Sequence, residues 1–556
     1  MTYWEASASG RVTGASSRWL RRVWGSSFLG KGSAAVGAGV RAGLAGSVLL
    51  SLEGGRSRSF GLESASLTLR VFTVLYVVLV RALGESFLGR TARRLGRGAS
   101  SSVILPLAGT FKVVAGAVGL PYQPEYLLMV LAGFAWVDWG ARHTLGGFAG
   151  AWDEMFLLFS FGCLLFAVFV ARRWDLRGVP ILAPLAVMIV AALGSIVVDR
   201  LSPELAVYAV RVTFEPMLFY FLGFLLPRDR RIIRWVVIIF LAASVLLALH
   251  GVFQYATHAP MPARWIDTHE KTLGTRAYSI IENPNGLGAF LLMGALLASG
   301  LALAPALPRR QRWLVAGVAL VLSAGIAVTF SRGAWIALAA GALALTALVR
   351  PRLLLAVVAA GVAVALFAPR AFVERVTFVF SSEYLAKSAT AGRLLMWNRA
   401  LHLIIEHPWW GIGLGTFGGS TAIQFNYSRL WVDSFYLQMG AEGGLILLLA
   451  FLWLLVRAGK GLLLAHREQT DPFLRAMTAG VFAAFIAVVI ANATAGVWET
   501  VAVGAGFWFL VGLASVPVDP AFRLPRVGRL EIVARHGLVV EEDAALASPS
   551  GGEARR

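Results

Sequence analysis

Arg332 stands where a charged side chain is costly unless it has a partner. It lies in the turn Thr329-Phe330-Ser331-Arg332-Gly333-Ala334, between the nearly uncharged stretches 313–330 and 334–349. At 1.5 Å per residue, each stretch is about long enough to cross a hydrocarbon core of about 30 Å. Arginine clusters mark the other ends of both stretches as cytoplasmic: Arg309, Arg310, Arg312, Arg350 and Arg352. Arg332 is therefore predicted at the outer face, where it either extends to lipid headgroups or turns inward to hold an anion.

The segment 369–431 carries more basic than acidic residues, although it is predicted to lie outside. Its basic residues are Arg370, Arg375, Lys387, Arg393, Arg399 and Arg429, against Glu374, Glu383 and Glu406. Within it, the apolar spacing of Leu394, Trp397 and Leu401 predicts an amphipathic helix that begins near Arg393. A helix N-terminus disfavours a cation and attracts anions. Arg393 is therefore either an exposed arginine tolerated at small cost or one side of an anion site.

Three further polar residues are candidates for the chemistry: one in the outer loop 369–431 and two in the span that follows it. Glycines follow His407 in the run His407–Gly415, which either approaches a substrate or packs onto the bundle. Asp433 opens the next span and Glu442 lies about two turns deeper. Ionisable residues inside a span are candidates for a functional role.

A second predicted outer loop, 257–283, supplies Arg276 and leads into Asn283-Pro284-Asn285. Arg276 is the third arginine beside a predicted outer span end, so it is a candidate anion ligand. The two asparagines are consistent either with a role in the site or with helix capping.

Two other site types are excluded. Gly413-x-Gly415-x-x-Gly418 matches a dinucleotide fingerprint, but a helical pattern precedes it and a span follows, so no strand–helix–strand unit is possible. The acidic residues of the outer loops are scattered, so no metal site is expected. No cofactor is expected either.

Composition identifies the class of protein. The chain has 58% hydrophobic and 14% charged residues and a mean hydropathy of +0.72, whereas soluble proteins have about a quarter charged residues. The net charge of +20 comes from short inter-span loops and terminal segments, which indicates membrane orientation and not nucleic-acid binding. The single Cys163 excludes a disulfide framework.

The predicted fold is all-α: a polytopic membrane helical bundle of about twelve transmembrane helices with a large helical outer loop. Residues 1–100 are predicted as a cytoplasmic or interfacial segment, 101–517 as the transmembrane domain with outer loops 257–283 and 369–431, and 518–556 as a partly disordered cytoplasmic tail. The predicted spans are 101–139, 154–171, 179–199, 208–226, 235–256, 284–305, 313–330, 334–349, 352–368, 432–456, 475–491 and 500–517.

Five motifs, in this order, resemble the O-antigen ligase and O-antigen polymerase family over about residues 100–517. They are Arg276-x5-Glu282-Asn283-Pro284-Asn285, Thr329-Phe330-Ser331-Arg332-Gly333, Gly392-Arg393-x3-Trp397, His407-Pro408-x-x-Gly411-Ile412-Gly413-x-Gly415 and Asp433-Ser434-x-Tyr436-Leu437-x4-Glu442-x-Gly444.

The resemblance implies a metal-independent, inverting glycosyltransferase of the bacterial cytoplasmic membrane, with its active site facing outside. Such enzymes move a glycan from a polyprenyl diphosphate carrier onto a hydroxyl of a glycan or lipid acceptor. It implies that Arg332 and Arg393, with Arg276, bind the diphosphate. The ligase branch has a functional histidine where this chain has Asp433, so ligation and polymerisation both stay open.

Guanidinium groups stabilise a departing diphosphate, and the acceptor hydroxyl needs a base, which a carboxylate can supply. Asp433 is the first candidate base, with Glu442 and His407 as alternatives. The expected partners are the lipid-linked glycan, its acceptor and membrane lipids, without nucleic acid. A transporter of lipid-linked sugars or anions would also place arginines at a membrane site, but it would usually show two related halves, which are not detectable here. A non-catalytic scaffold would leave the basic outer loop unexplained.

Overall fold

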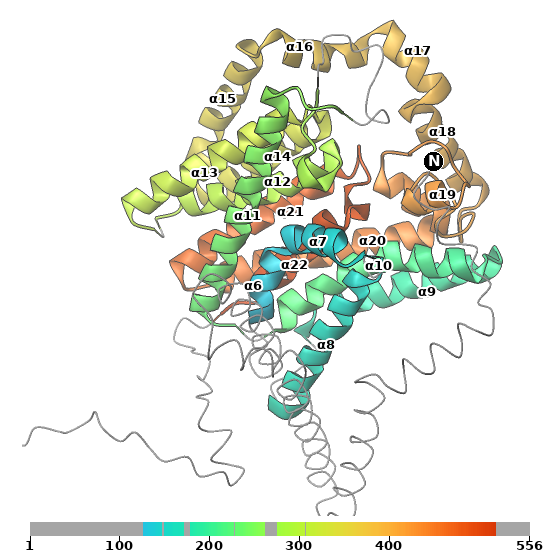
Figure 1. The fold of residues 1–556 in the computed structure, drawn as a ribbon, viewed down its shortest axis with the longest axis horizontal. Coiled ribbons are helices and arrows are strands. Elements are labelled where there is room, and N and C mark those ends of the chain that lie inside the picture. The colour runs from blue at the N-terminus through green and yellow to red at the C-terminus, as the bar shows by residue number, and fades with distance from the viewer. Residues whose placement is uncertain are drawn as a thin grey trace, which may run out of the picture. The chain divides into compact units, whose positions relative to one another are not determined.

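The computed structural model describes residues 126–146, 150–171, 178–226, 228–261, 275–305 and 307–518. The chain divides into two compact units, 1–123 with 165–174 and 124–164 with 175–556. The described residues belong almost wholly to the second unit (Figure 1). The predicted N-terminal segment 1–100, the first part of the span 101–139 and nearly all of the tail 518–556 lie outside the described residues.

Every regular element among the described residues is helical, as predicted. The α-helices are α6 (Leu127–Ala132), α7 (Phe134–Thr144), α8 (Trp152–Ala171), α9 (Leu182–Val198), α10 (Pro203–Leu225), α11 (Arg230–Ala256), α12 (Pro284–Leu303), α13 (Arg309–Val328), α14 (Arg332–Val349), α15 (Leu354–Leu366), α16 (Arg370–Thr377), α17 (Ser382–Ala391), α18 (Arg393–Glu406), α19 (Ser420–Gln424), α20 (Phe435–Glu468), α21 (Pro472–Ala491) and α22 (Val501–Ala514). Short 3-10 helices are η5 (Ser279–Ile281), η6 (Pro351–Leu353), η7 (Phe378–Phe380) and η8 (Val497–Glu499).

Seven of these helices are long and apolar enough to cross a membrane: α10, α11, α12, α13, α14, α20 and α21. The chain is therefore a multi-pass membrane protein. The helices α9, α15 and α22 coincide with predicted spans but are shorter, so the predicted count of twelve crossings is not established. The segment predicted as a large outer loop is itself helical, and in Figure 1 α16 to α19 follow one another from the end of α15. Its location outside the membrane stays a prediction.

The helix α12 is the centre of the bundle and has the most buried span of the seven. Asn283 caps its start, because the side chain accepts from the backbone N–H groups of Asn285 (2.9 Å) and Gly286 (3.1 Å). Pro284 follows at the first helical position, where its missing N–H is no loss. The predicted capping role of this asparagine is confirmed.

Glycines let two helices approach the backbone of α12 closely. A Cβ built on Gly300 would lie 2.8 Å from the Cα of Gly480 in α21, and one built on Gly288 would lie 2.9 Å from the Cβ of Ala334 in α14. Small residues at helix crossings are the usual means of packing where lipid removes the hydrophobic driving force. This packing holds the start of α14, and with it Arg332, against α12.

We expect Gly300→Ala to destabilise the bundle by about 1–3 kcal/mol, because the added methyl meets backbone that cannot move away. Gly317→Ala is the matched control, since a Cβ on Gly317 of α13 meets nothing within 4 Å. Thermal unfolding of both variants in one detergent measures the difference. Equal unfolding temperatures for the two variants would contradict the close α12–α21 packing.

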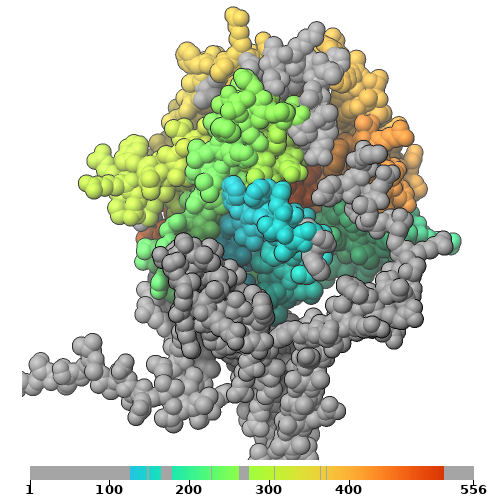
Figure 2. Space-filling model, viewed as in Figure 1, coloured from blue at the N-terminus to red at the C-terminus, as the bar shows by residue number. Residues whose placement is uncertain are grey.

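A buried ion cluster ties α7, α8 and α10 together. The carboxylate of Asp153, with a side chain 0% exposed, pairs with Arg142 and Arg211, each at 3.0 Å. Arg142 also pairs with Asp138 at 2.9 Å, and Arg211 with Glu215 at 3.1 Å. Elsewhere α7 is joined to α11, since Trp136 Nε1 donates to the carbonyl oxygen of Ala243 at 3.1 Å. The two helices lie side by side on the face shown in Figure 2.

Candidate functional site

Arg332 is the first residue of α14, and its side chain contacts the helical segment 369–431. The turn before it requires a left-handed backbone at Phe330 (φ 51°), and Ser331 N donates to Thr329 Oγ1 at 3.2 Å. Arg332 Nη1 donates to the carbonyl oxygen of Arg375 at 3.1 Å. Its guanidinium carbon lies 5.3 Å from the centre of the Tyr384 ring, over the ring face. Of the two orientations considered for Arg332, the structure has the one in which it turns toward the protein.

Arg375 of α16 returns this contact. Its Nε donates to the carbonyl oxygen of Phe330 at 3.2 Å, so the two arginines each bind the backbone beside the other. Phe372 packs on Phe330 and Trp335 with ring centres 4.9 and 5.0 Å apart. Arg375 was one of six basic residues in its segment, and nothing in its sequence neighbourhood distinguished it. The structure makes it a member of the site.

Arg393 is the first residue of α18, which confirms the helix predicted to begin there. Its Nε donates to Asp433 Oδ2 at 2.7 Å, and the two side chains are 30% and 28% exposed. Burial alone would lower the pKa of Arg393, but the Asp433 carboxylate and Tyr384 together outweigh it and the pKa is raised. The charge conflict expected for a cation at a helix start is therefore resolved by an anion of the chain itself.

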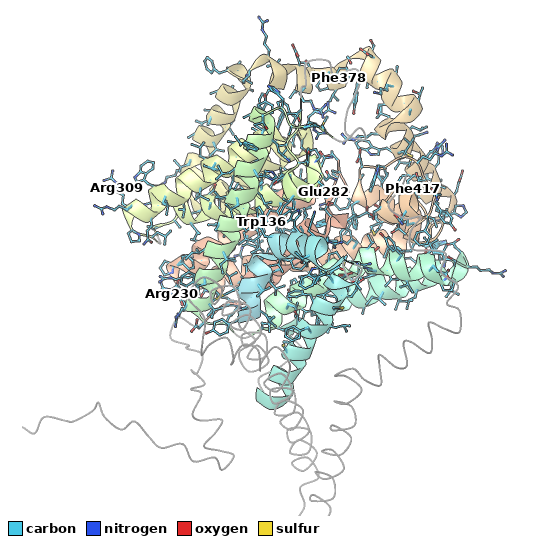
Figure 3. All side chains as sticks on the ribbon, viewed as in Figure 1. Trp136, Arg230, Glu282, Arg309, Phe378 and Phe417 are labelled. Atoms are coloured by element: carbon cyan, nitrogen blue, oxygen red, sulfur yellow. The ribbon has the colours of Figure 1, made fainter. Side chains whose placement is uncertain are left out.

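Tyr384 connects the two arginines that the sequence singled out. Its ring lies under Arg332, and hydrogen bonding by Tyr384 also favours the charged form of Arg393. Phe378 packs edge-on against this ring, with centres 5.5 Å apart. Arg332 and Arg393 thus both interact with one tyrosine of α17, while Arg375 contacts the turn of Arg332 and Asp433 pairs with Arg393. In Figure 3 three labelled residues help to locate this region: Phe378 at the top, Glu282 near the centre and Phe417 beside α18 and α19.

Arg276 contacts the turn that carries Arg332 and is itself only 7% exposed. Its Nε donates to the carbonyl oxygen of Thr329 at 3.0 Å and its Nη2 to Asn285 Oδ1 at 3.2 Å. The neighbouring Ala277 N–H donates to the carbonyl oxygen of Val328 at 3.0 Å. Arg276 is therefore placed to hold this turn, and a direct contact with substrate stays a prediction.

The glycine run after His407 packs onto a break in α20. Gly444 has φ 68° and ψ −170°, which interrupts the helix. The N–H groups of Ile412 and Gly413 donate to the carbonyl oxygens of Ala441 (3.0 Å) and Glu442 (3.1 Å). A Cβ on Gly411, whose φ is 71°, would lie 2.4 Å from the backbone carbon of Glu442. The run was predicted either to approach a substrate or to pack onto the bundle, and in the structure it packs onto α20.

The Glu442 side chain lies beneath this run and is 1% exposed. Its Oε1 accepts from Phe417 N at 3.1 Å and from Gln438 Nε2 at 3.4 Å. Gln438 also donates to Glu499 Oε1 at 2.7 Å, and Ser420 N donates to Glu499 Oε2 at 2.8 Å. Burial raises the pKa of Glu499. Glu499 was not predicted from the sequence, because a lone glutamate between two apolar runs has no local signal.

His407 is exposed and follows the last residue of α18, whereas Arg393 is the first. About 20 Å of helix therefore separates the two residues. His407 instead interacts electrostatically with Asp199, at the end of α9. The structure does not bring His407 to the arginines.

Among the described residues, no group of three or more His, Cys, Asp or Glu side chains could hold a metal ion. The chemical groups that converge are three guanidinium groups, one phenol and one carboxylate. Guanidinium groups match phosphate oxygens in charge and geometry, and the carboxylate can accept a proton.

Comparison with known proteins bears on the same part of the chain. Residues 316–452 match the family model described as O-antigen ligase. This range begins in α13 and ends in α20, so it contains Arg332, Arg375, Tyr384, Arg393 and Asp433. No curated protein matches the chain.

Proposed function

Because residues 316–452 match the O-antigen ligase family model, we propose that the chain transfers a glycan from a polyprenyl diphosphate carrier to an acceptor hydroxyl. The donor diphosphate binds at the arginines around Tyr384, at the outer face of the bacterial cytoplasmic membrane. The observation that carries the proposal is that Arg332 and Arg393 reach one tyrosine from two different helices, while Arg375 contacts the turn of Arg332 from a third. Three cations drawn together in one place favour a multiply charged anion.

The reaction breaks the bond between the anomeric carbon and the diphosphate oxygen and forms a bond to the acceptor oxygen. The leaving polyprenyl diphosphate gains negative charge as that bond breaks. Arg332 is fixed before the donor arrives, by the Tyr384 ring and by the carbonyl oxygen of Arg375, so its guanidinium needs little reorganisation to stabilise this charge. The acceptor proton passes to a base, and attack from the face opposite the leaving group inverts the anomeric configuration.

Asp433 is the carboxylate in contact with the arginine cluster, and we assign it as the base. In the protein without donor, its Oδ2 accepts from Arg393. A diphosphate that binds Arg393 competes for the same N–H donor and releases the carboxylate for the acceptor hydroxyl. The base would then become available only when the donor is bound, which limits unproductive proton transfer.

Glu442 and His407 are weaker candidates for the base. Glu442 is 1% exposed and accepts hydrogen bonds from Phe417 and Gln438, so an acceptor hydroxyl has no access to it without rearrangement of the glycine run. His407 lies at the far end of α18 from Arg393. Metal independence stays part of the proposal, as does the choice between ligation of a whole glycan and repeated polymerisation.

Two assays, one in detergent and one in sealed vesicles, distinguish an enzyme from a transporter. The purified chain in detergent, where no compartments exist, receives a lipid-linked glycan donor and a hydroxyl acceptor, and the products are identified by mass. Glycan joined to the acceptor is the expected result. A donor that stays intact in detergent but crosses the membrane of sealed vesicles containing the protein would contradict the enzyme and support the transporter.

A further inference from the structure

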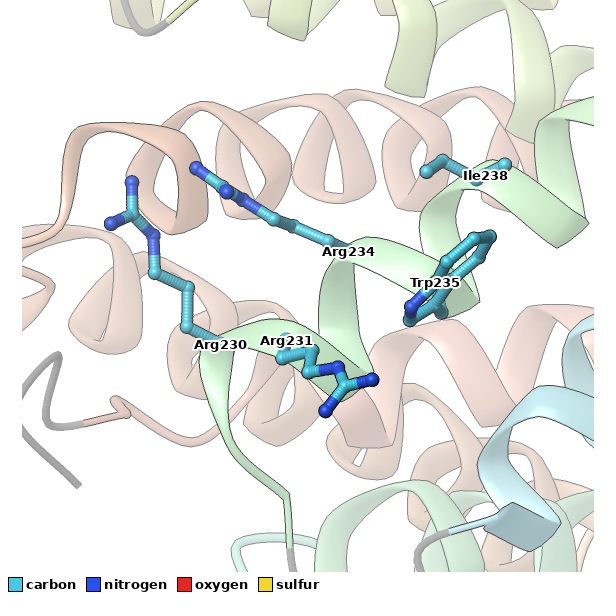
Figure 4. Close-up of a pocket in the computed structure, with 5 residues that line it drawn as sticks. All are labelled: Arg230, Arg231, Arg234, Trp235 and Ile238. Carbon is cyan, nitrogen blue, oxygen red and sulfur yellow. The ribbon is translucent and has the colours of Figure 1, made fainter. Parts of the chain in front are cut away.

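The first two turns of α11 form a basic pocket remote in sequence from the family match. The pocket has a volume of about 380 Å³ and is lined by Arg230, Arg231, Arg234, Trp235 and Ile238. Figure 4 shows Arg230 and Arg234 extending to one side of the helix, with Arg231 and Trp235 on another. These five residues are spaced as one broad helix face, so the backbone of α11 holds them together.

Two of the arginines also fix the pocket to the start of α21. Arg230 Nε lies 2.9 Å from Asp471 Oδ2, and the Asp471 side chain is only 4% exposed. The guanidinium carbon of Arg234 lies 5.4 Å from the centre of the Phe473 ring. Asp471 is itself held as the cap of α21, since it accepts from Phe473 N and Leu474 N. The pocket wall is therefore an ordered feature of the fold.

Positive charge exceeds negative charge in this region. A fourth arginine, Arg228, lies two residues before the pocket and is 7% exposed. Its Nη1 donates to carbonyl oxygens at the end of α10, including Phe224 at 3.0 Å, while Nε and Nη2 have no hydrogen-bond partner within the described part of the chain. Burial lowers the pKa of Arg228 to about 10, so it keeps its charge at neutral pH. The four arginines at positions 228, 230, 231 and 234 carry four positive charges, and the carboxylates of Asp229 and Asp471 balance two of them.

Polarity changes along α11 in the manner of a membrane boundary. Three arginines lie among its first five residues, and Trp235 follows with 47% of its surface exposed. Ile238, which is 54% exposed, begins the apolar part of the helix, and this helix is the most hydrophobic candidate span. Arginine and tryptophan at this depth contact lipid headgroups, and the exposed isoleucine lies at the depth of acyl chains. A soluble anion would use the arginines but gain nothing from the apolar side chains.

We propose that this pocket binds the headgroup phosphate of an anionic phospholipid, with an acyl chain along Trp235 and Ile238. The interaction is independent of glycan transfer, because it lies at the start of α11 and uses none of the residues around Tyr384. It gives α11 a fixed depth in the membrane and favours membranes rich in anionic lipid.

The test uses the purified intact chain in neutral detergent and follows its unfolding temperature as lipid is added. Phosphatidylglycerol and phosphatidylcholine with identical acyl chains form the main comparison, with inorganic phosphate as a third arm. Phosphatidylglycerol should stabilise the protein at lower concentration than phosphatidylcholine, and phosphate alone should not reproduce the effect. Arg231→Gln and Arg234→Gln should each weaken the apparent phosphatidylglycerol affinity about fivefold.

Arg310→Gln is the matched control, an exposed arginine at the start of α13 and outside the pocket. It should bind phosphatidylglycerol as the unchanged protein does. Equal responses to the two lipids, an equal loss in Arg310→Gln, or full stabilisation by inorganic phosphate would each overturn the proposal. Because Arg231 is exposed, its variant is expected to fold even if Arg234→Gln does not.

Discussion

Arg332→Ala is expected to reduce glycan transfer by about 10²–10³-fold, the usual cost of removing a fixed donor from a developing charge. The substitution removes the guanidinium over Tyr384 but leaves the Arg393–Asp433 ion pair in place. Steady-state transfer from a purified lipid-linked donor measures the loss. Arg332→Lys should recover only part of the activity, because an ammonium group lacks the planar fork that binds two phosphate oxygens.

Arg399→Ala is the control for general charge. Arg399 lies on the same helix as Arg393 and belongs to the same basic segment, but its side chain is exposed. Loss of this side chain should change the transfer rate little, because solvent and salt screen an exposed charge. If Arg399→Ala and Arg332→Ala lowered the rate equally, the arginines would act through the overall positive field. That result would contradict the proposed diphosphate site around Tyr384.

Asp433→Asn is expected to lower the single-turnover rate by about 10²–10⁴-fold at saturating donor, as for loss of a general base. Asparagine keeps the size of the side chain and an oxygen that accepts from Arg393 Nε, so donor binding should survive. Asp433→His, which restores the residue of the ligase branch, should retain part of the activity if only basicity matters.

The ion pair with Arg393 gives Asp433 a purely structural alternative role. In that case Asp433→Asn would lower the unfolding temperature or the donor affinity and leave the single-turnover rate nearly unchanged. Such a result would remove Asp433 from the chemical step. Glu442→Gln would then be the next variant to test, with the glycine run as the element that must move.

The helices could be predicted from the sequence because long apolar runs have few other structures available in a membrane. The start of α18 was also predictable, since apolar residues recur at helical spacing from Arg393 onward. The number of crossings was not, because α9, α15 and α22 are apolar but short. Length and hydropathy alone do not distinguish a short span from a buried helix.

The site itself could be predicted only in part. Arg332, Arg393 and Asp433 stood out as charges at the starts of spans or helices, but the Arg393–Asp433 ion pair joins residues 40 positions apart in the chain. The contact between Arg332 and the carbonyl oxygen of Arg375, for example, spans 43 positions. Tyr384 had no local signal, because a tyrosine in an amphipathic helix is ordinarily a packing residue. Its role follows only from the fold that brings α14, α17 and α18 together.

The glycine run after His407 was consistent with two hypotheses. Glycines at 411, 413 and 415 suggested close approach to a substrate or to the bundle, and all three have positive φ. The deciding feature is the break at Gly444, which exposes backbone carbonyls of α20 that the run then satisfies. Helical periodicity continues through that break, so the sequence did not reveal it.

The most direct measurement of the central claim is the phosphorus-31 spectrum of the donor during transfer by the purified chain. If the arginine site stabilises a departing diphosphate, signals of the glycosyl diphosphate should disappear as those of free polyprenyl diphosphate grow, one carrier for each new glycosidic bond. The Arg332→Ala variant should show the same products at a much lower rate. A product that keeps a phosphate on the glycan, or a donor signal that stays unchanged while acceptor and active protein are present, would contradict the account.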